Sequence, residues 1–547
     1  MDKKTEIRAI DLSEMSREEL EQQYMKLHTE YASACAKLEW LKEQFALAQK
    51  RTYGQSSEAG MDSDQLTWED FGLFNEAEAL RDPFNIESTE EDVLKESPGP
   101  HREKHKKDIS GLPVETIVYE LSPEEQICGQ CGAPLSEMKE IVRTEIEVIP
   151  AKVRVLRHVQ KVYTCRACDR LGRSGITGAP GMPVPLIPKS LAGPSLLAHA
   201  ISEKYTNAMP FYRQEQDWKR RGVGITRNNL CHWSIRVAND YGKILVDHMK
   251  KKLFADDVIH CDETEVQVLC EADRPAARKS YIWVMANAEY RSDCRIALYQ
   301  YTQTRSLQDA RKVLDGYRGY IMCDGYQVYD ALGTRKSDGN PPLETRPVAC
   351  LVHVRRKFTD ALKLIRKEDR KGTGAQEAVD RLHQIFAIDN GISREDIHKR
   401  KEFRQGELKA AIDAFFAWVD AEWDESLPKT AYGKALEYAR NQKEKVLRVF
   451  EDGRLELDNS LAERTVKPFV IGRKNWLFAD TPAGADASCI LYSLVETAKQ
   501  NGLIPYEYLR YVFEQMPGRR YTDDFIESLM PWSGNIPEHV KTPGNSQ

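Results

Sequence analysis

Residues 258–269 read VIHCDETEVQVL, an apolar run of strand length with an acid near its middle. β-Branched residues recur along the run, which predicts a β-strand. Asp262 lies inside this strand, and a carboxylate in a buried strand is costly unless it is paired or bound to a metal. Because a single acid in such a position is more often a turn or cap residue, the meaning of Asp262 depends on the other acids of the chain.

The runs that follow predict a mixed-sheet α/β domain. Asp324 ends the apolar stretch GYIMCD, directly before Gly325. Two strands that carry such acids can lie side by side, which would bring Asp262 and Asp324 together. Strands are expected at residues 281–290, 295–302, 319–329 and 348–358, and a helix at residues 306–316.

A third acid comes late in the chain, where residues 458–478 read DNSLAERTVKPFVIGRKNWLF. Glu463 lies on a helical pattern there, and a glutamate on a helix is usually a solvated surface residue. Three carboxylates brought together, however, hold two Mg2+ ions about 3.5–4 Å apart, with Mn2+ as an alternative. We therefore predict that Asp262, Asp324 and Glu463 are catalytic metal ligands. The basic residues of the same stretch would then contact DNA phosphates: Arg464, Lys467, Arg473 and Lys474.

Two CxxC pairs indicate a zinc ribbon within residues 109–185. Each pair places two thiolates on one metal, and two pairs complete a tetrahedral site. The segments RTEIEVI and VRVLRHVQKVY between the pairs predict a β-hairpin. The alternative is a set of buried free thiols. We predict one structural Zn2+, held by Cys128, Cys131, Cys165 and Cys168.

The first 55 residues carry a heptad pattern. Apolar residues are spaced alternately by four and three positions, as in the seam of a coiled coil that joins chains into a homodimer or higher oligomer. A single amphipathic helix packed on its own domain is the alternative. Residues 56–108 follow as a polar linker, with 13 acidic and two basic residues between Ser56 and Ser97. The seam consists of Leu20, Tyr24, Leu27, Tyr31, Ala34, Leu38, Leu41, Phe45 and Ala48.

Residues 186–255 predict a helical DNA-binding domain. A basic helix, FYRQEQDWKRRG, ends at Gly222, and Thr226 is a candidate cap for a second helix. Helix, glycine turn and helix together suggest a helix-turn-helix, although helical hairpins that bind no DNA are common. The exposed polar groups of its recognition helix would be Arg227, Asn228, Asn229 and His232.

The remaining segments complete the expected organisation. The catalytic core is predicted in two parts, residues 256–358 and 455–515. A charged helical insertion separates them at residues 359–454. Residues 516–547 are expected to form a C-terminal tail.

Composition constrains the class of protein only weakly. The net charge of the 547-residue chain is −6, so the whole-chain charge indicates no partner. The N-terminal residues lack an apolar signal core, and no run reaches transmembrane length, so we expect a soluble, cytoplasmic protein without a membrane partner.

These motifs carry a resemblance to a known family. The chain resembles the DDE transposases of bacterial insertion sequences, specifically the insertion-sequence sixty-six family, along nearly its whole length. The resemblance implies a ribonuclease-H-like core, with the acids of the DET, DGY and LAER motifs falling on Asp262, Asp324 and Glu463. It also implies DNA partners (element ends and target), strand cleavage with 3′-hydroxyl strand transfer, small accessory proteins of the same element, and a nucleoid-associated location. The motifs are RTYGQSSE, RHVQKVYTCRAC, PLIPKSLAGPSLLAHAISEKY, HCDETEV, CDGYQVY, VHVRRKF, DNSLAERTVKPFVIGRKNWLF and YSLVETAKQNG.

Two other functions fit parts of this pattern. One is a metal-dependent DNA nuclease of the same fold that performs no strand transfer. The other is a non-catalytic regulator that binds DNA through the zinc ribbon and the helix-turn-helix. The regulator would be expected to lack one of the acids, whereas all three are present in this sequence.

Overall fold

The structure is a computed structural model whose described residues form two units. It describes Arg17, Met25, residues 153–159, the strand backbones 162–164 and 176–178, and residues 183–543 without 273, 288–289, 291–292, 334–341 and 395. The larger unit contains Leu186–Thr542, and the smaller one lies within Gln65–Pro185. The coiled-coil seam, the linker and the four CxxC cysteines lie outside the described residues.

The smaller unit contains one short antiparallel strand pair. Strand β1 (Val162–Thr164) pairs with β2 (Ile176–Gly178), with Tyr163 opposite Thr177. The strand predicted for VRVLRHVQKVY is confirmed only at its end, where Val162 and Tyr163 belong to β1, whereas residues 153–159 form no strand and Val155 is 89% exposed. Apolar alternation alone does not make a strand when its backbone groups find no partner strand.

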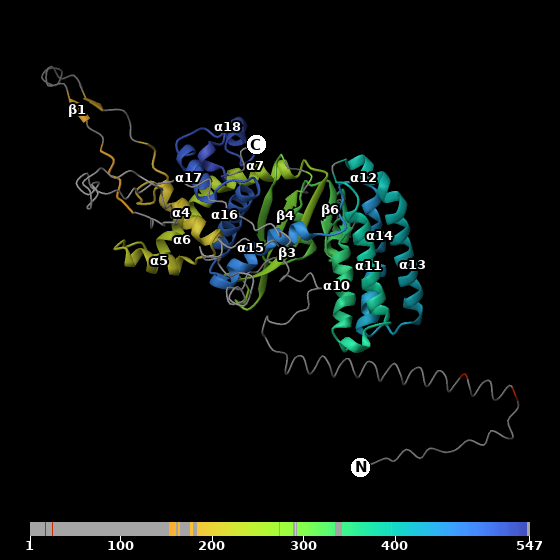
Figure 1. Ribbon diagram of the computed structural model, residues 1–547. Coiled ribbons are helices and arrows are strands. Elements are labelled where there is room, and N and C mark those ends of the chain that lie inside the picture. The colour runs from red at the N-terminus through yellow and green to blue at the C-terminus, as the bar shows by residue number, and fades with distance from the viewer. Residues whose placement is uncertain are drawn as a thin grey trace, which may run out of the picture. The chain divides into compact units, whose positions relative to one another are not determined.

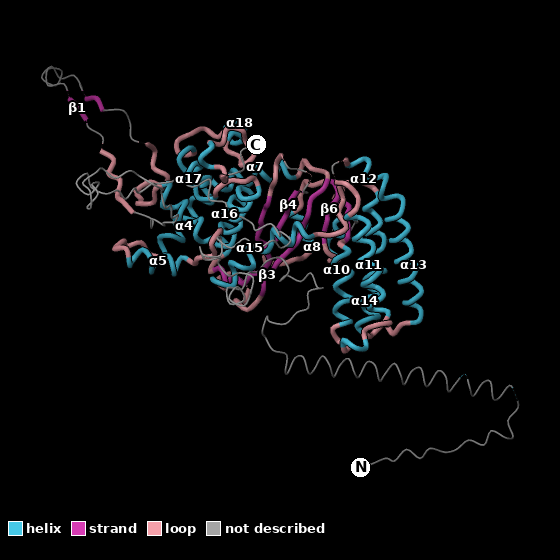
Figure 2. The backbone as a smooth tube through the Cα atoms, viewed as in Figure 1, coloured by secondary structure: helices cyan, strands magenta, loops and turns pink. Residues whose placement is uncertain are grey.

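A mixed sheet lies at the centre of the larger unit (Figures 1 and 2). Among the described residues its order is β5-β4-β3-β6-β7, and β8 pairs with the C-terminal end of β3. Strand β4 is antiparallel to β3 and β5, whereas β3, β6 and β7 are parallel. The bounds are Val258–Val268 (β3), Lys279–Asn287 (β4), Ala297–Thr302 (β5), Gly319–Cys323 (β6), Thr345–Ala349 (β7) and Phe478–Ala479 (β8).

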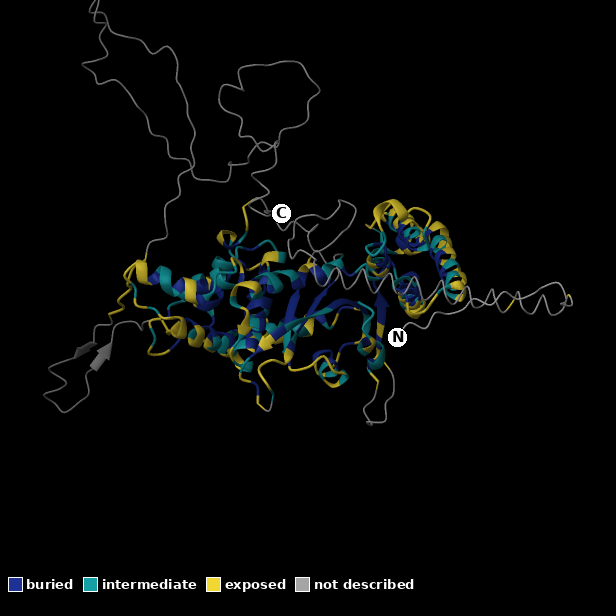
Figure 3. Cartoon of the chain, turned by 90° about the horizontal axis from the view of Figure 1, so that it is seen from below, coloured by how far each residue is buried: buried dark blue, intermediate teal, exposed yellow. Residues whose placement is uncertain are grey.

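Helices cover the sheet, so that its strands are the most buried part of the unit (Figure 3). One apolar core joins the sheet to the N-terminal helices, to α15 (Ser460–Trp476) and to the C-terminal helices. The N-terminal helices of this core are α4 (Pro194–Tyr205), α6 (Arg227–Val237) and α7 (Lys243–Leu253). Helix α5 (Phe211–Arg220) packs through Phe211 and Trp218 in a separate small cluster with Ala200 and Leu230. The C-terminal helices are α16 (Pro482–Gln500), α17 (Pro505–Gln515) and α18 (Asp523–Ser528).

Helix α16 also completes the outer edge of the sheet. Strand β5 is an edge strand, and its outward backbone groups need partners. Thr497 Oγ1 accepts from the Ala297 N–H at 3.1 Å, and Ser493 Oγ accepts from the Tyr299 N–H at 2.9 Å. The two hydroxyls therefore replace a neighbouring strand.

Two predicted strands are partly helical. Only the beginning of residues 348–358 is extended, because β7 ends at Ala349 and α10 (Leu351–Leu362) follows. Leu351, Val354 and Phe358 are buried at the three- and four-residue spacing of a helix, and this period outweighs the strand propensity of the segment. The last three residues of the GYQVY segment likewise belong to α9 (Gln327–Leu332), which follows β6.

The predicted insertion is a helical bundle beside the sheet (Figure 1). Helix α10 begins it, and the chain returns close to where it left, because the Leu351 N–H donates to the Leu457 carbonyl oxygen at 2.8 Å. A second apolar core, which includes Val258, Met322 and Val348 of the sheet, fills the bundle. Its other helices are α11 (Gly374–Asn390), α12 (Ile397–Phe403), α13 (Lys409–Glu425) and α14 (Ala431–Leu447).

The prediction of a C-terminal tail is wrong for residues up to Thr542. Ile536 and Val540 are buried in the core of the larger unit, and Leu503 bridges to Lys541 in an antiparallel manner. The segment has few apolar residues and several prolines and glycines, so it lacks the periodicity that would have identified it. Along the described residues, no helix is long and apolar enough to cross a bilayer.

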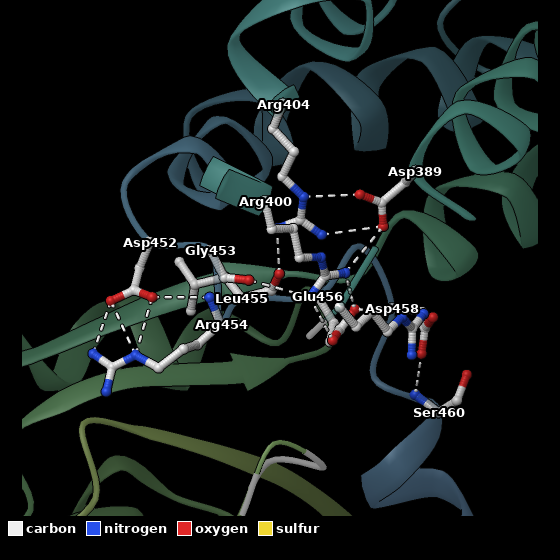
Figure 4. A network of polar contacts seen from close by, with 11 residues as sticks. Asp389, Arg400, Arg404, Asp452, Gly453, Arg454, Leu455, Glu456, Asp458 and Ser460 are labelled. Atoms are coloured by element: carbon white, nitrogen blue, oxygen red, sulfur yellow. Dashed lines mark hydrogen bonds and ion pairs between the residues drawn. The ribbon is translucent and has the colours of Figure 1, made fainter. Parts of the chain in front are cut away.

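A buried ionic network ties the bundle to the segment that returns to the sheet (Figure 4). Arg404 is fully buried and donates to both carboxylate oxygens of Asp389, at 2.8 and 3.1 Å. Arg400 donates to Glu456 at 2.7 and 2.9 Å and to the Gly453 carbonyl oxygen at 3.1 Å. The network therefore fixes the chain shortly before α15 begins.

We expect Asp389→Ala to destabilise the larger unit strongly. The change leaves the Arg404 charge buried without its carboxylate, and breaking such a pair costs about 3–5 kcal/mol. The matched control is Asp413→Ala, which removes the exposed Lys409–Asp413 pair on α13, where an ion pair contributes at most about 1 kcal/mol. Urea denaturation of both variants measures the difference, and equal losses would show that the network is not stabilising.

Candidate active site

Asp262 and Asp324 lie on neighbouring parallel strands. Strands β3 and β6 pair with His260 opposite Met322, so two further residues along each strand bring Asp262 level with Asp324. Asp324 lies just past the end of β6, where its Oδ1 accepts from the Tyr326 N–H at 2.9 Å. The structure therefore places the two acids level with each other on adjacent strands, as the sequence pattern had suggested.

Glu463 reaches the same region from the first turn of α15. Its side chain is only 9% exposed, so it is not a solvated surface residue. Two side chains of α10 lie beside it: His353 Nε2 is 3.5 Å from Oε1, and Arg356 Nη2 is 3.8 Å from Oε2. Helix α10 follows β7, so Glu463 lies near the C-terminal ends of the parallel strands β6 and β7.

Asn459 connects α15 to the strand of Asp262. It is fully buried and precedes the first residue of α15, yet its side chain does not cap the helix. Its Oδ1 lies 2.9 Å from His260 Nδ1, and its Nδ2 donates to the Cys261 carbonyl oxygen at 2.9 Å. The Asn459 N–H also donates to Cys350 Sγ, at 3.2 Å. This residue, which sequence reasoning missed, fixes the start of α15 against β3.

The acids of the site interact electrostatically. Burial raises the pKa of Asp262 well above its usual range, and the carboxylates of Glu263, Asp324 and Glu463 raise this pKa further. Burial also raises the pKa of Glu463, where Arg356 opposes the shift and Asp324 adds to it. The three predicted ligands therefore lie close enough to repel one another as anions.

Glu263 and His353 lie beside the three acids, and their burial and their own contacts account for their shifted pKa values. Burial raises the pKa of Glu263 to about 7, and this carboxylate accepts from the Tyr329 hydroxyl at 3.0 Å. Burial and the nearby Arg356 lower the pKa of His353 to about 4, so its imidazole is neutral at pH 7. The contact between His353 and Glu463 is therefore not an ion pair at that pH.

The three acids supply the donors that Mg2+ prefers, namely carboxylate oxygens. Within the described part of the chain, no three or more His, Cys, Asp or Glu side chains are gathered tightly enough to hold an ion as they stand. The residues fit a divalent ion in chemistry and in burial, and a bound cation would offset their repulsion.

The predicted DNA contacts fall on two helices. In the helical pair α5–α6, Gly222 has a φ of 76° in the turn, and Thr226 caps α6 by accepting from the Asn229 N–H at 3.2 Å. The side chains predicted for this recognition helix are exposed: Arg227, Asn228, Asn229 and His232.

The other predicted contacts lie along α15. Arg464 and Lys474 are exposed, whereas Lys467 and Arg473 are half-buried. Ten residues separate Arg464 from Lys474, so this basic stretch extends about 15 Å from the turn that carries Glu463.

Comparison with protein families identifies the chain. A sequence model described as "Transposase IS66 family" matches residues 189–487, more than half of the chain. The chain belongs to the IS66 transposase family. The matched range includes Asp262, Asp324 and Glu463, together with the whole helical insertion. The resemblance predicted from the motifs is therefore confirmed, and DDE transposases of this kind use divalent metal ions.

Three further models match other parts of this IS66 transposase. The "zinc-finger binding domain of transposase IS66" matches residues 125–169, a range that contains both CxxC pairs and implies zinc binding. The "IS66 C-terminal element" matches residues 493–532, and "Transposase C of IS166 homeodomain" matches residues 40–117.

Curated relatives are similar over most of the chain. The uncharacterized protein y4jD of Sinorhizobium fredii is 29% identical over 444 residues, which cover 79% of this chain and 83% of that protein. The uncharacterized protein y4qI of the same organism is 26% identical over 391 residues, which cover 71% and 70%.

We expect Asp262→Asn to stabilise the metal-free protein near neutral pH. A carboxylate whose folded-state pKa is raised destabilises the fold as the pH rises above the unfolded-state pKa, and this loss is complete above the folded-state pKa. Each pKa unit between the two corresponds to about 1.4 kcal/mol. Below about pH 4 the acid is protonated in both states, and the gain should disappear. Thermal unfolding across pH 4–8 tests this, and a variant that is less stable than the unmodified protein at pH 8 would contradict the repulsion.

Proposed function

We propose that this IS66 family member is a DDE-type transposase that cleaves the ends of an insertion sequence and joins the 3′-hydroxyls to target DNA. The observation that carries the proposal is the convergence of Asp262, Asp324 and Glu463. What supports it is that Asp262 of β3 lies level with Asp324, which follows the adjacent parallel strand β6, and that Glu463, from a helix far along the chain, is buried near them. The proposal gives a reason for three repelling acids to be kept together at a cost in stability.

The proposed roles of the residues follow from their chemistry. Asp262, Asp324 and Glu463 would hold two Mg2+ ions, with Mn2+ as a substitute, and such ions activate the attacking water or 3′-hydroxyl and stabilise the leaving oxygen. Asn459 orients the helix of Glu463. Arg356 lies beside Glu463, where it can contact a phosphate oxygen of the bound strand.

The order and directions of the strands support a ribonuclease-H-like description of this core. Three strands form an antiparallel meander, and two parallel strands are added beside its first strand, β3. In chain order within this sheet, the acids then lie on the first strand, just after the fourth strand, and on a helix that comes after the fifth.

The proposed DNA contacts serve two purposes. Along α15, the basic stretch would contact phosphates beside the cleaved bond, which positions DNA without reading its sequence. The exposed face of α6 would read the element end in the major groove, with Arg227, Asn228 and His232 as the contacting side chains.

The N-terminal regions are proposed to support assembly. Cys128, Cys131, Cys165 and Cys168 would bind one structural Zn2+, and the heptad from Leu20 to Ala48 would join chains so that two element ends can be held together. Small accessory proteins of the same element are further proposed partners, and the nucleoid is the proposed place of action.

Replacing any of the three acids with alanine should abolish cleavage and leave DNA binding intact. The metal ligands are lost, whereas affinity for phosphates comes mainly from Lys and Arg. The test is Mg2+-dependent cleavage of duplexes taken from the two ends of the element that carries the gene. The control Glu265→Ala removes an acid three residues from Asp262 that pairs with Lys279 instead.

Glu463→Ala gives the sharpest result. Activity within tenfold of the unmodified protein, a barrier change of only about 1.4 kcal/mol, would remove Glu463 from the catalytic set. Products that are cleaved and never joined to a target duplex would favour the nuclease over the transposase.

Lys474→Ala should weaken DNA binding and reduce its salt dependence by about one counterion. Lys474 lies at the exposed end of the basic stretch, away from the turn of Glu463, so the cleavage rate of saturated complexes should change little. Fluorescence anisotropy at 50–300 mM salt measures the slope. An unchanged slope would remove Lys474 from the DNA interface.

The purified protein should contain about one zinc ion per chain. A four-cysteine site contributes its binding free energy to folding, so Cys128→Ser should release the zinc and unfold the ribbon. Metal analysis by mass spectrometry measures the content. Folded and active protein without zinc would contradict the structural role.

A further inference from the structure

The helical insertion contacts the loop that carries Asp324. Tyr438 of α14 lies against Gly325: a Cβ placed on this glycine would be 2.4 Å from the tyrosine hydroxyl oxygen and 2.8 Å from two ring carbons. Gly325 does not have a positive φ, so its lack of a side chain matters for space rather than for backbone conformation.

Further contacts hold α14 in this place. Lys445 of α14 is 9% exposed, and its Nζ lies 2.8 Å from the Asp330 carboxylate of α9, the helix that follows the Asp324 loop. On the other side, Lys357 Nζ of α10 lies 5.3 Å from the centre of the Tyr438 ring. Burial raises the pKa of Tyr438, and the nearby Asp324 raises it further, so the phenol stays protonated at pH 7 and keeps its hydroxyl.

Contacts within the loop fix the side chain of Asp324 but not the position of the loop. One carboxylate oxygen accepts from the Tyr326 N–H, which fixes the side chain relative to its own loop. The position of the loop relative to Asp262 depends on what packs against it, and Tyr438 is the side chain that a bulkier residue at position 325 would strike first. A shift of about 1 Å at such a site is enough to impair metal binding and catalysis.

We propose that Tyr438 is a positioning residue for Asp324, so that the helical insertion completes the active site. The inference rests on the proposed function, because it assumes that Asp324 binds a divalent ion. The insertion would then take part in the active site, because its α14 sets the distance between two metal ligands. Tyr438 acts through the loop and contacts no substrate in this assignment.

The first experiment compares two tyrosines of α14. Tyr438→Phe removes the hydroxyl that packs against Gly325. The control Tyr432→Phe removes a hydroxyl that donates to Glu422 inside the bundle at 2.7 Å. Mn2+ binding to the full chain without DNA is measured by calorimetry, and the Mg2+ concentration for half-maximal cleavage is measured alongside. We expect Tyr438→Phe to weaken both about three- to tenfold, because the Asp324 loop can shift into the space that the hydroxyl leaves, and Tyr432→Phe to change neither.

The second experiment tests the steric contact. Gly325→Ala should weaken Mn2+ binding, and Gly325→Ala combined with Tyr438→Ala should bind no worse than Tyr438→Ala alone, because the clash is gone. The matched pair lies inside the bundle, where a Cβ on Gly374 would be 2.2 Å from the Tyr432 hydroxyl oxygen. Gly374→Ala should lower thermal stability and leave Mn2+ binding unchanged.

The outcomes separate this inference from the proposed function. Normal Mn2+ binding by folded Tyr438→Phe, or equal harm from Gly325→Ala with and without the tyrosine ring, overturns the positioning role. If the unmodified chain binds no Mn2+, or if Glu463→Ala binds it as well as the unmodified chain, the proposed metal site itself fails.

Discussion

The parallel pairing of β3 with β6 is the constraint on which the candidate site depends. It brings Asp262 level with Asp324 on adjacent strands, and no rotamer change can separate the two backbones. The other elements of the site are arranged around these two acids. Helix α15 adds a third acid, α10 places a cation beside that acid, and Asn459 holds the start of α15 against β3. The sheet thus provides the spacing, and the helices supply charge and orientation.

Much of this arrangement was predictable from local sequence. Apolar runs of strand length identified five of the strands, and an acid inside or just after such a run identified Asp262 and Asp324. The segment VACLVHVRRKF was ambiguous because a short apolar run suits a strand and a buried helix equally well. The structure decides for a helix, because the buried residues of this segment lie three or four positions apart.

What the sequence could not reveal depends on contacts between distant residues. Asn459 reads as an ordinary helix cap, yet its side chain bonds to a strand 199 residues earlier, at His260. Tyr438 lies within a charged helical segment and has no motif around it. Ile536 and Val540 come from a stretch without periodicity and are nevertheless buried. In each case the partner, rather than the residue type, determines the role.

The contacts of the helical insertion bear on whether it has a function in the catalytic core. Its two ends are joined by the hydrogen bond between Leu351 and Leu457. The bundle therefore spans only a short distance between the two points where it connects to the sheet. Since the entropy of closing a loop rises only slowly with its length, such an insertion is tolerated even when it has no function. A passive insertion, however, needs no contact with the core beyond its base. Tyr438 and Lys445 reach past that base to the loop of Asp324 and to α9, which is where an insertion that had become part of the active site would be expected to make contact.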